Sequence, residues 1–86
     1  LYIEESDHSA RVFAQITLGM KPDLVDARIL LASSYARSEN IDQAIEQYRK
    51  IPDNHHAYLG AQHAAAQLLA DHGRMDESVV LLNQLY

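Results

Sequence analysis

The sequence predicts an all-α fold: an α-solenoid of antiparallel helix pairs, with five helices in about two and a half repeating units. One observation is composition, because the 86 residues hold only three Gly and two Pro among many helix-forming residues. Another is a fixed period, since Ala32 and Ala66, and also Asp42 and Asp76, lie 34 positions apart. A period of about 34 residues with two helices per unit is typical of stacked helical hairpins.

The N-terminal quarter is expected to contain two helical segments. Residues 1–3 read as the end of a truncated helix, and the first of the five helices is expected over about residues 7–18, capped by Ser6 or Asp7. Gly19 then supplies the left-handed residue that ends a helix. The apolar stripe of this helix is expected to comprise Val12, Phe13 and Ile16.

A helix over about residues 24–37 is expected next. Pro22 is tolerated in a first turn and Asp23 can cap it, so these residues separate the two helices. Asn40 and Gln43 resemble a capping box that opens a third helix, and Pro52 ends this helix. Its single apolar stripe consists of Ile41, Ala44, Ile45, Tyr48 and Ile51.

The last part of the chain predicts two more helices. One is expected over about residues 54–72, where many Ala residues allow a neighbouring helix to approach closely, and Gly73 ends it. A fifth helix is expected over residues 75–85, and the outer face with Val80 and Leu81 is expected to stay uncovered unless something packs there. Its inward residues are expected to be Met75, Val79, Leu82 and Leu85.

The residues of the second unit resemble the tetratricopeptide repeat. Leu31, Ala32 and Tyr35, followed by Ala44 and Tyr48, stand at that family's L-G-x2-Y and A-x3-F spacing, with Ala in place of Gly and Tyr in place of Phe. The resemblance implies a stack of helical hairpins that presents a recognition surface.

The resemblance covers residues 1–86 as one repeat domain. Its units are expected at about residues 1–24, 25–58 and 59–86. The family's Trp position holds Arg28 and Gln62, so the units are degenerate. Because the chain opens near the end of a helix, we expect an excerpt of a longer array or a processed product. The segments 48–54 and 73–78 are similar in style to bacterial members of the family.

Composition excludes several classes of function. A net charge of −5 and seven scattered Lys and Arg argue against a nucleic-acid partner. The absence of Cys excludes disulfides and thiolate metal sites. No run of about 18 apolar residues occurs, so neither a membrane span nor a signal peptide is expected. The compartment stays open between cytoplasm and periplasm.

The five His residues are the one compositional oddity, and they raise the question of a metal site. No two His lie at the i, i+4 spacing that directs two rings to one ion, and no HExxH motif occurs. In a helix, His55 and His56 would point about 100° apart. We therefore expect solvated or loosely hydrogen-bonded His, with no metal and no cofactor.

The residues of catalysis are missing from the sequence. Ser33, Ser34 and Ser38 have no adjacent His and carboxylate, there is no Cys nucleophile, and no Gly-rich phosphate loop is present. A chain of this length also has little room to enclose an active site. The sequence therefore predicts that these residues are not an enzyme.

The resemblance implies a groove lined by the first helix of each pair. Carried over, the family's register selects Asp26, Ile29, Leu30, Ser33 and Arg37, and then Gly60, His63, Ala64, Gln67 and Asp71. The Lys, Asn and Arg with which some members hold a terminal carboxylate are absent, and so is the Asn ladder of a sugar-transferase superhelix. This leaves a mildly apolar groove with Ser33, His63 and Gln67 as hydrogen-bonding points and Arg37 near Asp71 at one rim. The alternative is that Ile29 and Leu30 simply pack between helices.

Three functions follow as hypotheses. The first is a non-catalytic protein-interaction scaffold that binds a peptide or a helix of a partner in the groove. The second is self-association through exposed repeat ends, and the third is a regulatory array of a larger multidomain enzyme. The identity of a protein partner cannot be read from the sequence.

Overall fold

The computed structural model describes residues 2–85, with side chains from His8 onward, and all regular structure in that range is helical. The prediction of an all-α fold is therefore confirmed for the described residues. The five helices are α1 (Tyr2–Met20), α2 (Val25–Arg37), α3 (Ile41–Arg49), α4 (Tyr58–Asp71) and α5 (Met75–Leu85).

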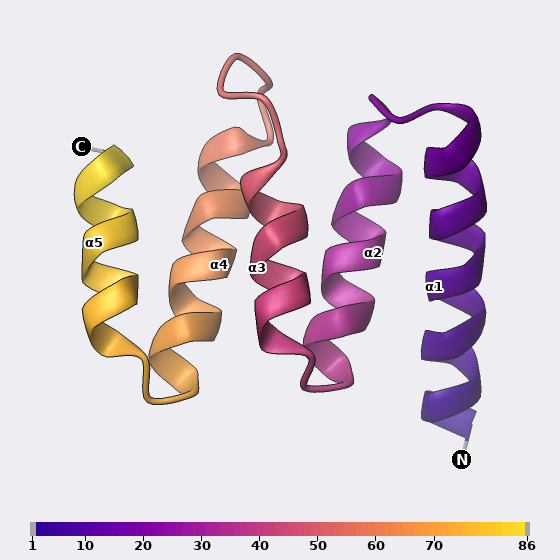
Figure 1. Cartoon of the computed structure of the whole chain (residues 1–86), viewed down its shortest axis with the longest axis horizontal. Helices are drawn as coiled ribbons and strands as arrows, with labels where there is room; N and C mark the ends of the chain where they lie inside the picture. The colour runs from indigo at the N-terminus through magenta and orange to yellow at the C-terminus, as the bar shows by residue number, and fades with distance from the viewer. Residues whose placement is uncertain (1, 86) are drawn as a thin grey trace.

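The helices lie side by side in one row, and successive helices run in opposite directions (Figure 1). Each helix packs mainly on its neighbours in sequence. The row is flat, with extents of 34 × 31 × 15 Å. The two short turns, α2–α3 and α4–α5, lie at the same edge of the row, so these helix pairs form two hairpins of the same orientation (Figure 1).

The two hairpin turns share one backbone geometry. The N–H of Asn40 donates to the carbonyl of Tyr35 at 2.9 Å, and the N–H of Arg74 donates to that of Leu69, also at 2.9 Å. This bond from one residue to the fifth before it is typical of the Schellman C-cap, which needs a left-handed residue. Glu39 has φ 60° and Gly73 has φ 76°. Both features recur at the 34-residue period of the sequence.

Small buried residues let the helices of each hairpin approach closely. Ala32 of α2 and Ala66 of α4 are both buried in one apolar cluster. Ala44 and Ser78 are the buried small residues of α3 and α5, and Ser78 Oγ donates to the carbonyl of Ala66 at 2.8 Å. The buried cluster consists of Ala32, Tyr48, Ile51, Ala61, Ala65, Ala66, Leu69 and Leu81.

The prediction of two helical segments at the N-terminus was wrong. A single helix, α1, runs continuously through residues 2–20, and Leu1 lies outside the described residues. Gly19 is part of α1 and does not adopt a left-handed conformation. The sequence pattern could not show this, because a helix end at Gly depends on the bonds that follow it, and here the N–H of Lys21 continues the helical pattern to the carbonyl of Thr17.

The apolar stripe of α1 was also placed on the wrong face. Phe13 is 64% exposed and Ile16 is 59% exposed, and Val12 is exposed as well. The fully buried residue is Ala14. The reason lies in a polar contact, because Arg11 binds α2: its Nη2 donates to the carbonyl of Ser34 and to Ser38 Oγ, and its guanidinium stacks 4.7 Å from the Tyr35 ring centroid. These contacts turn the apolar stripe toward solvent.

The predicted side-chain caps do not form. Pro22 and Asp23 belong to a turn before α2, whose N-cap residue is Leu24, without a side-chain hydrogen bond. The carbonyl of Pro22 instead accepts a bond from Arg28 Nη2 at 2.9 Å, which ties the turn to α2. Asn40 is the N-cap residue of α3, with φ −86° and ψ 73°, and its side chain makes no cap bond, so the capping box with Gln43 was wrong.

The connection between α3 and α4 is longer than predicted. The expected helix over residues 54–72 begins only at Tyr58, because the preceding residues form turns in which the N–H of His55 donates to the carbonyl of Pro52. His55 and His56 therefore do not diverge as in a helix: their rings stack, with centroids 4.3 Å apart. His55 Nδ1 also accepts a bond from the N–H of Ala57, which fixes the start of α4.

The bounds of α5 agree with the prediction, but its inward face is rotated. Val80 is 57% exposed, as expected, whereas Leu81 is only 3% exposed, which contradicts the prediction. Met75 and Val79, expected to face inward, are exposed. The bond from Ser78 to α4 sets this rotation, because it turns Ser78 and Leu81 together toward the core.

Candidate functional site

A small hollow opens between α2 and α4 at the predicted groove. Its volume is about 270 Å³. It is lined by Ile29, Tyr48, Ala57, Gly60, Ala61 and Ala64. Three of these, Ile29, Gly60 and Ala64, belong to the groove register that the resemblance selects. The structure thus brings predicted residues of the two first helices to one hollow.

The sequence of α4 explains why this site is hollow. Ala57, Gly60, Ala61 and Ala64 follow at steps of three, one and three, so they share one face at the start of the helix. A Cβ atom added at Gly60 would meet no other atom within 4 Å, so space remains above the backbone. Ile29 of α2 stands opposite as the one large aliphatic wall.

The base of the hollow comes from α3. Tyr48 is buried, and its carbonyl accepts a 2.7 Å bond from Nε2 of the buried Gln62, which ties the last turn of α3 to α4. The Tyr48 hydroxyl lies 3.5 Å from Ser33 Oγ of α2. A Tyr that is apolar along its ring and polar at its tip suits a recognition site, because the hydroxyl pair can fix the register of an apolar ligand.

The other groove residues predicted from the sequence lie outside the hollow. Leu30 is half-buried, while the remaining side chains are exposed: Asp26, Arg37, His63, Gln67 and Asp71. Gln67 Nε2 donates to Asp71 Oδ1 at 2.8 Å within α4. The expected position of Arg37 near Asp71 at one rim stays a prediction.

Sequence reasoning missed Tyr48, Ala57 and Ala61. Tyr48 was assigned to the buried stripe of the third helix, and its hydroxyl was the available signal that it also reaches a surface. Ala57 and Ala61 were recognised only as small residues for helix packing. They line the hollow because the helix starts at Tyr58, later than expected, with Ala57 as its N-cap residue.

Two features are absent from the described part of the chain: metal-binding clusters and membrane-spanning helices. Within it, no three His, Cys, Asp or Glu side chains come together in a way that could hold a metal ion. None of its helices combines the length and the apolar character that crossing a bilayer requires. Comparison of the chain with models of protein families, with curated proteins and with solved structures gives no match.

Proposed function

We propose that this chain is a non-catalytic protein-interaction module, a tetratricopeptide-like α-solenoid that binds a peptide or a helix of a partner protein in the groove between α2 and α4. The observation that carries the proposal is the apolar hollow where Ile29, Gly60 and Ala64 meet. A repeat architecture is supported by the recurrence of the same C-cap at Glu39 and Gly73, one period apart.

The chemistry of the hollow favours an apolar anchor side chain. Apart from the Tyr48 hydroxyl, the lining side chains are apolar or absent, so burial of the ligand's apolar surface supplies the affinity, at roughly 25 cal/mol per Å². The paired hydroxyls of Ser33 and Tyr48 offer one hydrogen-bonding point beside it. An amphipathic segment that inserts one large apolar residue fits this arrangement.

The proposal is tested by selecting binders from a random peptide library on the intact chain and measuring their affinity for two variants. Ala64→Glu places a charge in the hollow and is expected to weaken binding by at least about tenfold, because a carboxylate would be desolvated there. Asn83→Glu adds the same charge at an exposed position of α5 and serves as the matched control. Equal binding to both variants would show that the groove between α2 and α4 is not the binding site.

A second candidate is self-association, favoured by the outer face of α1. Val12 and Ile16 are exposed, whereas the positions one period later hold Glu46 and Lys50, which form an ion pair at 3.4 Å. An apolar stripe where the next unit carries solvated charges supports an interaction surface on α1. Sedimentation at several concentrations tests this: dimers that Phe13→Glu dissociates would support it, and a monomer at every concentration would exclude it.

A further inference from the structure

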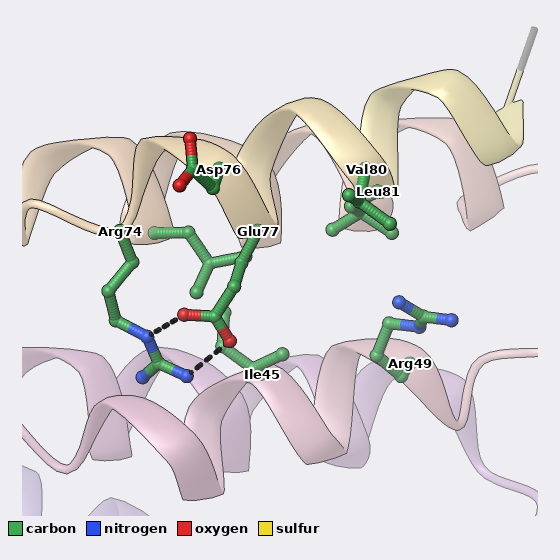
Figure 2. Close-up of a pocket in the computed structure, with 8 residues that line it drawn as sticks. Ile45, Arg49, Arg74, Asp76, Glu77, Val80 and Leu81 are labelled. Carbon is green, nitrogen blue, oxygen red and sulfur yellow. Dashed lines mark hydrogen bonds and ion pairs between the residues drawn. The ribbon is translucent and has the colours of Figure 1, made fainter.

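A second hollow lies between α3 and α5 and is distinct from the α2–α4 groove. Its volume is about 330 Å³, and it shares no lining residue with the first hollow. It is lined by Ile45, Arg49, Leu69, Arg74, Asp76, Glu77, Val80 and Leu81. Its centre is apolar, and polar side chains stand at its two ends (Figure 2).

One end of this groove is closed by a charged bridge. Arg74 Nε and Nη2 donate to the two carboxylate oxygens of Glu77 at 2.6 and 2.8 Å, and Arg74 Nη1 donates to Asp42 Oδ1 at 2.6 Å. Asp76 lies in the same first turn of α5. Two carboxylates thus bind a single guanidinium, and Asp76 adds a further negative charge, so this end is negatively charged.

The other end carries an uncompensated cation. Arg49 Nη2 donates to the neutral amide oxygen of Gln84 at 3.2 Å and has no carboxylate partner within the described residues. The neighbouring Lys50 is paired with Glu46. A carboxylate makes a stronger bond to a guanidinium than an amide does, so a ligand carboxylate can displace Gln84.

The corresponding positions one period earlier carry different side chains. Ile45 and Leu69 of this groove correspond to Arg11 and Tyr35, both 34 residues earlier. There the guanidinium of Arg11 lies 4.7 Å from the Tyr35 ring centroid and covers it. With Ile in place of Arg and Leu in place of Tyr, this stacked pair has no counterpart in the α3–α5 groove, whose floor is formed by the buried Leu69 and Leu81.

We propose that the α3–α5 groove binds an amphipathic helix of a partner protein that carries a basic residue, a large apolar residue and an acidic residue at successive turns. Val80 lies one helical turn after Asp76 on α5, and Ile45 lies one turn before Arg49 on α3. A helix parallel to α3 and α5, with its apolar residue between Ile45 and Val80, therefore places residue i−4 at the acidic end and residue i+4 at Arg49. The charge pattern fixes the partner's chemistry, and the order of the two charges along the partner helix sets its direction.

Designed helical peptides test this inference directly. The matched peptide has Lys, Phe and Glu at positions i−4, i and i+4 of an Ala-rich helix, and a control peptide has Lys at both charged positions, so that either direction of binding places a Lys at Arg49. Fluorescence anisotropy is expected to show about fivefold tighter binding of the matched peptide, since the control turns an attractive charge contact into a repulsive one. Arg49→Glu is expected to remove or reverse this preference, and Val80→Asp is expected to abolish binding of both peptides.

Ala64→Glu, in the α2–α4 groove, is expected to leave this binding unchanged, which separates the test from that of the proposed function. Circular dichroism verifies that the variants are folded. Equal affinity for the two charge patterns, unchanged binding after replacement of the peptide's Phe by Ala, or no binding at about 1 mM peptide would each overturn the proposal. Self-association of the chain that Val80→Asp prevents would show a second copy as the occupant and would also overturn it.

Discussion

The hairpins α2–α3 and α4–α5 have the same turn but fill it with different residues. Glu39 adopts φ 60° in the first turn, where Gly73 adopts φ 76° in the second. At the position whose carbonyl accepts the capping bond, the first hairpin has half-buried Tyr35 and the second has buried Leu69. The backbone of the two hairpins repeats more closely than their side chains do.

This comparison separates the features that define the repeat from those that differ between the hairpins. The capping hydrogen bond of the turn and the spacing of small residues are common to both hairpins, so they define the repeating geometry. The strained Glu39 is found only in the first hairpin, and the buried Leu69 and the buried Ser78 hydroxyl only in the second. We therefore expect the two hairpins to contribute unequally to the free energy of unfolding. Paired substitutions at equivalent positions can measure that difference.

The largest change in the free energy of unfolding is expected from substitutions at the equivalent residues Leu69 and Tyr35. Leu69→Ala removes a buried side chain from the core cluster, and we expect it to lower the free energy of unfolding by about 3 kcal/mol. Tyr35→Ala removes a half-buried ring that stacks with Arg11 and is expected to cost less. Urea unfolding measures both values; an equal loss would show that the two hairpins contribute equally.

Substitutions at the equivalent turn residues Gly73 and Glu39 are expected to change the stability in opposite directions. Gly73→Ala forces a side chain into the left-handed region and is expected to destabilise the chain by about 1 to 2 kcal/mol. Glu39→Gly relieves that strain and is expected to stabilise it by about 0.5 to 1 kcal/mol. Thermal melting of both variants tests this, and effects of the same sign would contradict the shared C-cap.

A smaller effect is expected at the contact between the helices of each hairpin. Ser78→Ala removes the bond to the Ala66 carbonyl and is expected to cost about 1 kcal/mol. The converse change, Ala44→Ser, is expected to be nearly neutral, because the carbonyl of Ala32 stands at the equivalent position as an acceptor. A loss at Ala44→Ser as large as that at Ser78→Ala would indicate that the two contacts differ in geometry.

The smallest expected effect is the dependence of the stability on pH. Hydrogen bonds from Arg74 lower the pKa of Glu77, so the stabilising interaction is fully present above the ordinary pKa of Glu and is lost as the pH falls through the lowered value. A titration of the Glu77 carboxyl carbon by NMR is expected to show a midpoint below that of an ordinary Glu. The Arg74→Ala variant is the control, and an unchanged midpoint in it would exclude Arg74 as the cause.

The helix pattern was predictable wherever apolar spacing and packing agree. The sequence predicts α2 to within one residue and both ends of α5. It fails at α1, because the residues that bind α2 there are Ala14 and a long Arg, while the apolar residues face solvent. It also fails at the start of α4, because the turns after Pro52 depend on local bonds that hydrophobic spacing does not encode.

The candidate site could be predicted only in part. Ile29, Gly60 and Ala64 belong to the groove register that the resemblance implies for the first helix of each pair. Tyr48 required knowledge of how α3 packs beneath both helices. The α3–α5 groove required a comparison of equivalent positions in three dimensions, since the significance of Ile45 lies in the absence of a covering Arg.

The claim most in need of a direct test is that the α2–α4 hollow is the recognition surface. Amide and methyl chemical shifts of the isotope-labelled chain, followed during titration with a library-selected peptide, locate the contact residue by residue. The account predicts that the largest changes fall at Ile29, Tyr48, Gly60 and Ala64. Changes confined to the exposed stripe of α1 or to the α3–α5 groove, with these four residues unaffected, would contradict it.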